Sequence, residues 1–295
     1  MSKLSLIDFC EIPADNQIPW LDRCSVLGAD YLSDNQRKWQ KSGFLIVDHA
    51  VDEEKLQAYE YWRLLRNLPD AYGCLPNPFA YQFISEVRNI ALSPTVHKVM
   101  YELFQEPMVA HFDLTQWKST ERKWHQDDYL NDESINGHYA AVWFAIDNIA
   151  ADSGPFQYIE GSNNWPVMRR EKIMAKMKKE DANSPSWPVL SEQFVGELFD
   201  EKIKENNIPV ESFLPLRGQA LIWHARLVHR GSLPKNSLCS RKSLIVHFTA
   251  LSKTNPKLHD IRYSEDGCAY IWHKNIKFED WPEETGIKRF IPLHY

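Results

Sequence analysis

The chain has 295 residues, a formal net charge of −6 and a pI of about 6.0. Hydrophobic residues make up 43% and charged residues 25%, a globular composition that excludes a collagen, a coiled coil and a disordered chain. The acidic balance argues against nucleic acid as a partner, and no apolar run approaches the roughly 20 residues that a membrane span needs.

Three helices and a short strand are predicted in the N-terminal part, residues 1–107. The helices are expected over residues 33–41, 52–66 and 93–105, and the strand within residues 42–50. Ser33 or Asp34 would cap the first helix, and Ser93 followed by Pro94 begins the third.

From residue 108 onward the pattern is that of strands. Short apolar or alternating runs occupy residues 108–118, 139–147, 156–160, 219–224 and 241–250. Turn signals such as Asn136-Gly137 separate them, and so many strands without intervening helices predict an antiparallel sandwich or barrel. Because no repeat or low-complexity linker is present, we expect one domain, with this core over about 108–250 and a C-terminal extension over 251–295.

An insertion over about residues 164–210 interrupts the strands. It is highly charged, and a helix is predicted over residues 191–206. It is expected to lie as a lid beside the mouth of the barrel, with a packing helix that has no binding role as the open alternative.

The five cysteines are scattered and form no Cys-x-x-Cys pair, which is typical of free thiols in a reducing cytosol. Acidic residues near the N-terminus replace the apolar centre of a signal peptide. A cytoplasmic protein is therefore expected, and its oligomeric state is not indicated.

A possible iron site is the main chemical feature. Non-haem iron(II) sites use two histidines and one carboxylate, and His-x-Asp on a strand would point two of these ligands the same way. Two such pairs exist, His111 with Asp113 and His125 with Asp127, whereas about one is expected by chance. A third ligand must come from a distant segment.

Four segments in order resemble the phytanoyl-CoA dioxygenase family: WHQDDYL, SGPFQYIEGSNNW, GQALIWHARLVHRGS and SRKSLIVHF. The similarity begins at SGFLIVDHAVDEEKL, residue 42, and runs to about residue 250, with a gap over the insertion. Members are oxygenases that depend on iron(II) and 2-oxoglutarate. The resemblance implies a mainly β fold with flanking helices and a double-stranded β-helix, or jelly-roll, core.

The resemblance also implies roles for individual residues. His125, Asp127 and His229 would bind iron(II), and Arg241 would bind the far carboxylate of 2-oxoglutarate, as a guanidinium can do in a bidentate pair. Three further positions match family residues around the cosubstrate: Ser232, Trp143 and Lys118.

The implied reaction consumes 2-oxoglutarate and O2, releases succinate and CO2, and hydroxylates a small organic molecule. Relatives mostly act on free small molecules, so the family's name does not imply an acyl-CoA substrate here. Desaturation or ring closure would use the same residues and stays open. Related halogenases lack the carboxylate ligand, so the presence of Asp127 favours oxygenation.

The sequence departs from the family pattern near the third ligand. The family usually reads His-Gly-Ser, and this chain has an extra residue, Arg230, between His229 and Gly231. A bulge could absorb the shift, but the predicted role of Ser232 depends on it. Two other departures, Asn163 and Gln219, fall outside the ligand positions.

The other histidines have different expected roles. The pair His111 and Asp113 lies too early for the motif order. His224 is five residues before His229, so on one regular strand the two would face opposite sides. His224 is interpreted either as a packing residue or as a residue that supports a metal ligand. His247 is six residues after Arg241, so on one strand the two side chains face the same side. His247 would then point into the barrel, with an ordinary core histidine as the alternative.

Four residues could contact substrate, each with a structural role as the alternative: Asp128, Tyr129, Trp165 and Arg170. Two other functions are also compatible with the sequence. One is a non-catalytic jelly-roll binding module, which would need neither the triad nor Arg241. The other is a cupin-type metalloenzyme without 2-oxoglutarate, a group that typically shows a His-x-His pair absent here.

Overall fold

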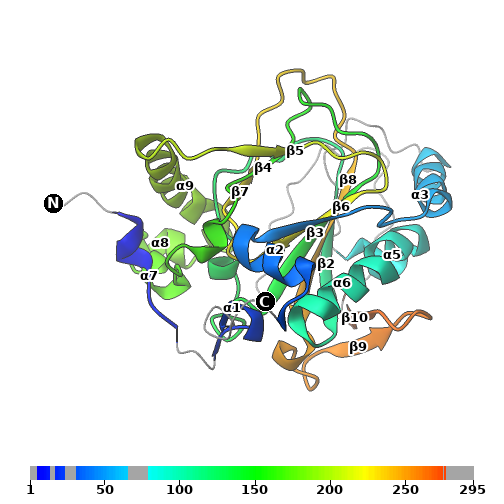
Figure 1. The fold of residues 1–295 in the computed structure, drawn as a ribbon, viewed down its shortest axis with the longest axis horizontal. Coiled ribbons are helices and arrows are strands. Elements are labelled where there is room, and N and C mark those ends of the chain that lie inside the picture. Colours follow the sequence, from blue (N-terminus) through cyan, green and yellow to red (C-terminus); the bar gives the residue numbers. More distant parts are fainter. Residues whose placement is uncertain (1–4, 14–16, 24–30, 66–78, 275, 277–295) are drawn as a thin grey trace.

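Two β-sheets face each other at the centre of the molecule (Figure 1). The computed structural model describes residues 5–13, 17–23, 31–65, 79–274 and 276. The large sheet has the strand order β1 (Phe44–Val47), β6 (Ala220–His224), β3 (Tyr139–Ala145), β8 (Ser243–Ala250), β2 (Met108–Gln116), β10 (Ala269–Trp272) and β9 (Asp260–Tyr263). The small sheet has the order β5 (Glu211–Phe213), β4 (Phe156–Tyr158) and β7 (His229–Gly231). All pairings are antiparallel except β10 with β2.

The alternation of side chains along β3 explains how the large sheet separates two cores. Every residue of this strand is buried, because both of its faces are covered. Val142 and Phe144 pack toward the helices, whereas Tyr139 and Trp143 point into the space between the two sheets. There the ring of Trp143 meets Phe213 of the small sheet at 5.6 Å, edge to face. This inner core forms the interior of the barrel.

Helices cover the outer face of the large sheet, at the right of Figure 1. They are α3 (Glu53–Leu65), α4 (Ala80–Phe83), α5 (Ser85–Ala91) and α6 (Pro94–Phe104), with α1 (Trp20–Arg23) and α2 (Asp34–Ser42) nearby. The hydroxyl of Ser33 caps α2 by accepting from the amide of Gln36, and Ser93 caps α6 in the same way. The three helices and the strand predicted in this part of the sequence are confirmed within a residue or two, whereas α1, α4 and α5 were not predicted.

The insertion forms α7 (Arg170–Met174), α8 (Lys179–Ala182) and α9 (Trp187–Glu205) at the other side of the molecule. Its apolar residues share a cluster with the N-terminal turn Leu6–Phe9 and with Trp124. At Gly196 the helix α9 comes so close to the preceding loop that an added Cβ would lie 2.8 Å from Cβ of Lys123. Helix α9 begins four residues before the predicted start.

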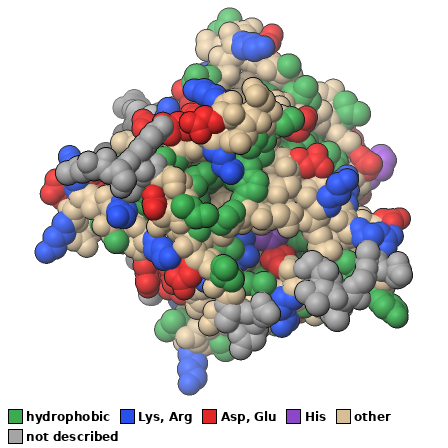
Figure 2. Space-filling view, turned by 60° about the vertical axis from the view of Figure 1, so that its left-hand side comes forward, with side chains coloured by type: hydrophobic (Ala, Val, Ile, Leu, Met, Phe, Trp, Pro, Cys, Tyr) green, Lys and Arg blue, Asp and Glu red, His purple; other side chains and the backbone are tan. Residues whose placement is uncertain are grey.

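The jelly-roll class predicted from the sequence is confirmed, but the sheet extends beyond residues 108–250. Strand β1 comes from the N-terminal part, and β9 and β10 come from the extension that follows residue 250. Within the described residues, no helix is long and apolar enough to cross a membrane. Figure 2 shows a face on which acidic and basic side chains are interspersed and hydrophobic ones border a central hollow.

Candidate active site

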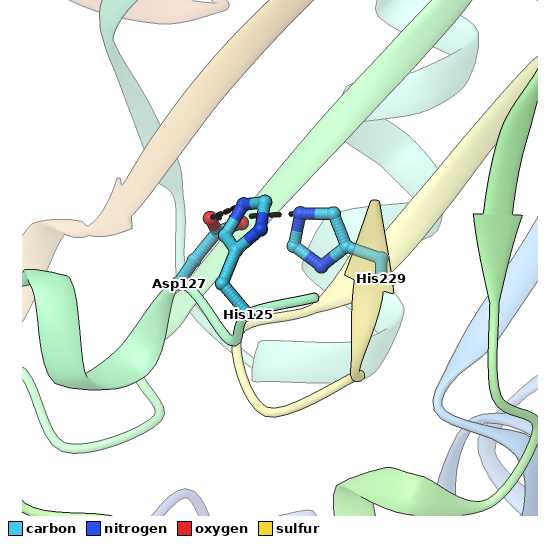
Figure 3. A group of neighbouring side chains, drawn as sticks. All are labelled: His125, Asp127 and His229. Atoms are coloured by element: carbon cyan, nitrogen blue, oxygen red, sulfur yellow. Dashed lines mark ion pairs between the residues drawn. The ribbon is translucent and has the colours of Figure 1, made fainter. Parts of the chain in front are cut away.

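Three buried side chains converge between the two sheets: His125, Asp127 and His229 (Figure 3). One potential ligand atom from each lies within 4.8 Å of the others. Oδ1 of Asp127 is 3.8 Å from Nε2 of His125 and 3.7 Å from Nε2 of His229. Among the described residues this is the one cluster of three His, Cys, Asp or Glu side chains with metal-ligand spacing.

The backbone brings the three side chains together in a way that strand alternation did not predict. His125 and His229 form an antiparallel bridge, with N–H···O distances of 3.1 and 3.0 Å in the two directions. Asp127, in contrast, has a helical backbone (φ −73°, ψ −26°) at the start of the turn Asp128–Leu130. The chain therefore turns after His125, and the expectation that the pair lies on one regular strand is wrong.

Both histidines present Nε2 to this cluster. Nδ1 of His125 lies 2.7 Å from the carbonyl oxygen of Lys123, and Nδ1 of His229 lies 2.9 Å from that of Leu227. A carbonyl only accepts, so each Nδ1 carries the proton and each Nε2 keeps its lone pair. Burial lowers the pKa of both imidazoles, for His125 well below the usual value, and they are neutral at pH 7. Neutral imidazole is the form that binds metals.

The carboxylate of Asp127 is oriented from the large sheet. Nε1 of Trp223 on β6 donates to its Oδ2 at 2.9 Å, which leaves Oδ1 facing the two histidines. Sequence analysis did not identify Trp223 as a functional residue. No spacing rule links it to Asp127, because the two residues meet only through the fold.

Arg241 lies in the same cavity as the three residues. It is 1% exposed, and its terminal nitrogens donate to the carbonyl oxygens of Gly154 (3.1 Å) and Lys118 (3.3 Å). Burial lowers the pKa of the guanidinium to about 10, so it remains a cation at neutral pH. Trp143 lines the cavity too, and its ring centre is 5.9 Å from the Arg241 guanidinium carbon.

The structure does not bring Ser232 or Lys118 to the cavity. The hydroxyl of Ser232 donates to the carbonyl oxygen of Pro155 at 2.7 Å, and the Lys118 side chain is exposed. Strand β7 ends at Gly231, which pairs with Phe156. The extra residue after His229 is accommodated in this pairing, and the hydroxyl that follows is occupied by the neighbouring loop.

Arg122 is a second cation at the cavity, which sequence analysis missed. Its Nε donates to Oε2 of Glu192 on α9 at 3.1 Å, and a terminal nitrogen donates to Oε1. Although burial opposes it, Glu192 raises the pKa of Arg122, so this guanidinium is charged. The only sequence feature that could have indicated Arg122 is its position three residues before His125. The ion pair connects the insertion to the cavity wall.

Two of the four predicted substrate residues have structural contacts. The carboxylate of Asp128 accepts from Nε of Arg226 at 2.8 Å and from the amide of Gly137 at 2.7 Å. Tyr129 is 2% exposed and packs in the apolar cluster beneath the insertion. Neither residue lines the cavity at the metal-ligand cluster.

The other two belong to the insertion. Trp165 lines a separate cavity of about 410 Å³ between the N-terminal turn, the segment 165–168 and α9. The guanidinium of Arg170 lies 4.5 Å from the ring centre of Trp187. The structure therefore places neither at the cavity that contains Arg241.

The competing histidines lie outside the cluster. His224 ends β6, whereas His229 begins β7, so they are not on one strand as assumed. Nε2 of His224 lies 3.2 Å from Oδ2 of Asp22, and its ring packs against Trp39, which confirms a packing role. His247 lines the cavity wall, and its Nδ1 lies 2.5 Å from the hydroxyl of Tyr139.

The pair His111 and Asp113 lies on β2, away from the cluster. Oδ1 of Asp113 accepts from the amide of Tyr81 at 2.9 Å, and burial raises the pKa of this carboxyl to about 7. Burial lowers the pKa of His111 to about 3. The interpretation of this pair as a chance match is therefore supported.

Comparison with known proteins adds a family match. The family model described as phytanoyl-CoA dioxygenase (PhyH) matches residues 76–243. No curated protein matches the sequence.

Three solved structures share the fold. The epimerase SnoN from nogalamycin biosynthesis, in complex with Fe3+, alpha ketoglutarate and nogalamycin RO, is 13% identical, with a TM-score of 0.52 over 80% of this chain and 96% of that one. The carbocyclase SnoK from the same biosynthesis is 16% identical, with a TM-score of 0.52 over 82% and 98%. HygX from Streptomyces hygroscopicus, with nickel and 2-oxoglutarate bound, is 14% identical, with a TM-score of 0.50 over 75% and 88%. At these identities the likeness shows the fold.

Proposed function

The chain belongs to the phytanoyl-CoA dioxygenase family, and we propose that it is the iron(II)- and 2-oxoglutarate-dependent oxygenase that this membership indicates, with His125, Asp127 and His229 as its metal ligands. Its substrate is a small organic molecule, and succinate and CO2 are released. The observation that carries the proposal is that the three ligand side chains and Arg241 line one cavity.

The donor set fits iron(II). Two neutral imidazoles and one carboxylate are the ligands of the facial triad, which leaves coordination positions for other molecules. Both imidazoles present a lone pair at Nε2, and Asp127 presents Oδ1 to both of them. When bound, the iron would activate O2 for oxidation of the substrate, with 2-oxoglutarate as the source of two electrons.

Arg241 fits the far carboxylate of 2-oxoglutarate. A buried guanidinium that remains charged binds a carboxylate more strongly than an exposed one does, because water competes less. Trp143 provides an apolar wall next to it. SnoN and HygX, which share the fold, were solved with this cosubstrate bound. Ser232 and Lys118 have no part in this proposal, because neither lines the cavity.

We also propose that the insertion over residues 164–210 limits the access of water to the cavity. Glu192 on α9 is bound to Arg122 at the cavity wall, so a movement of α9 would move part of that wall. Exclusion of water protects reactive intermediates in such enzymes. A cytoplasmic location is proposed as well, since the three described cysteines are all free thiols.

Metal and cosubstrate titrations test the function without knowledge of the substrate. Anaerobic calorimetry of the metal-free protein should show one Mn2+ per chain and then one 2-oxoglutarate that binds only after the metal. The variants Asp127→Ala and His229→Ala should fold but bind Mn2+, and with it 2-oxoglutarate, far more weakly than the wild type. Binding of 2-oxoglutarate without metal, or no metal binding by the wild type, would contradict the proposal.

A further inference from the structure

We propose that Trp223 is a positioning residue that determines which atom of residue 127 faces the metal, and that it thereby sets the affinity for metal. The inference rests on the proposed function, because it takes Asp127 as a ligand. Trp223 is neither a ligand nor one of the residues that the family resemblance assigned.

The two oxygens of the Asp127 carboxylate have different surroundings. Oδ2 accepts the indole N–H of Trp223 at 2.9 Å. Oδ1 lies 3.8 and 3.7 Å from the two imidazole nitrogens. The indole thus occupies one oxygen and aims the other at the position where the metal would bind.

Asp127 needs this orientation more than the two histidines do. Each histidine has its backbone in the bridge and its Nδ1 fixed by a carbonyl two residues earlier. Asp127 lies in a turn, outside any strand. Within the described part of the chain, Trp223 is the one side chain that donates a hydrogen bond to its carboxylate.

Trp223 is a rigid donor. It lies on β6, the second strand of the large sheet, where it pairs with Phe44 of β1 on one side and Ala141 of β3 on the other. Its side chain is 2% exposed, and its ring packs against Phe156 at 4.9 Å and His229 at 5.3 Å. An indole N–H can only donate, so it forms its hydrogen bond with an oxygen of residue 127 and never with an NH2 group. Outer groups that hold ligands in this way commonly contribute about 10–100-fold to metal affinity.

The first test removes the donor and keeps an aromatic ring. Trp223→Phe should raise the Kd for Mn2+, measured by calorimetry without 2-oxoglutarate, by about 10–100-fold. It should also change the EPR spectrum of the bound Mn2+, because the carboxylate is no longer fixed. Trp39→Phe is the matched control, since Trp39 is equally buried but packs against His224. Its Kd should stay within about threefold of the wild type.

The second test uses the selectivity of the donor for an acceptor. In Asp127→Asn, Trp223 should bind the amide oxygen, which turns the NH2 group, a poor ligand, toward the metal. Asp127→Asn should therefore bind Mn2+ as weakly as Asp127→Ala. In the double variant Asp127→Asn with Trp223→Phe, the amide oxygen is released toward the metal, and the affinity should recover at least about threefold over Asp127→Asn alone.

A merely structural role of Trp223 makes the opposite prediction, since a second destabilising change would lower the affinity further. The inference is overturned if Trp223→Phe folds and keeps the wild-type Kd, or if Asp127→Asn binds Mn2+ clearly better than Asp127→Ala. The latter comparison does not require Trp223→Phe to fold. A wild type that binds no Mn2+ would instead refute the proposed function.

Discussion

Replacement of Arg241 is the most direct test of the cosubstrate site. In Arg241→Ala the cavity loses its buried guanidinium, whereas the three metal ligands are unchanged. We expect the variant to bind Mn2+ normally and 2-oxoglutarate weakly. This separation of the two binding steps distinguishes a lost contact from a misfolded site.

The size of the effect follows from the burial of the side chain. Arg241 is 1% exposed and keeps its charge at neutral pH, because burial lowers its pKa only to about 10. Removal of one partner from a buried charge pair costs about 2–5 kcal/mol. The smaller value corresponds to a Kd for 2-oxoglutarate that is about thirtyfold higher. Arg241→Lys should lie between the wild type and Arg241→Ala, because lysine keeps the charge but cannot form a bidentate pair.

Anaerobic calorimetry with Mn2+ in place of iron measures both steps in one protein sample. Lys118→Ala provides the control, because this side chain is exposed and does not line the cavity. Its Kd for 2-oxoglutarate should change by less than about threefold. The reasoning is refuted if Arg241→Ala binds 2-oxoglutarate within threefold of the wild type while retaining Mn2+. A large effect of Lys118→Ala alone would move the carboxylate site to that lysine.

Further predictions concern the rest of the molecule. His224→Ala should keep Mn2+ binding but melt at a lower temperature by calorimetry, because it loses a contact with Asp22, whereas His229→Ala should lose the metal. Glu192→Gln should increase trypsin cleavage between Arg169 and Lys179 if the ion pair with Arg122 holds the insertion, and unchanged cleavage would contradict this. Asp113 has a raised pKa in the folded state, so its ionisation reduces stability as pH rises from about 4 to about 7. In urea unfolding, Asp113→Asn should therefore have a higher free energy of unfolding than the wild type at pH 8, and this difference should be smaller at pH 5. Mn2+ binding should be unchanged. If the free energies of unfolding of the two proteins change in parallel with pH, the pKa of Asp113 is not raised.

Much of the fold could be predicted because local patterns and burial agree along most strands. Strand β3 is flanked by turn signals, and its apolar run is buried on both faces. Strands β9 and β10 could not be predicted in the same way. They are short, and β10 joins the large sheet through β2, which lies far away in the sequence, while β9 pairs only with β10. Helix α9 begins at Trp187, where Pro188 suits the first turn, and the sequence analysis placed its start too late.

The cluster of His125, Asp127 and His229 could be predicted from motif order, although the geometric reason offered for it, one regular strand, was wrong. His125 meets His229 through a bridge, and Asp127 lies in the turn that follows, a combination that has no simple sequence period. Trp223 and Arg122 were missed because their partners, Asp127 and Glu192, are distant in sequence. Such contacts depend on tertiary structure, which residue spacing does not encode.

The close approach at Gly196 has a consequence for protein engineering. Any residue with a Cβ at this position would come within 2.8 Å of Cβ of Lys123, and 3.3 Å from the carbonyl oxygen of Trp124, so α9 or the loop before His125 would have to shift. Libraries that vary residues of α9 to broaden substrate range should therefore keep the buried position 196 constant. Variation there would shift the loop before His125 together with the insertion. Selection could then not separate a new substrate preference from damage to the proposed metal site.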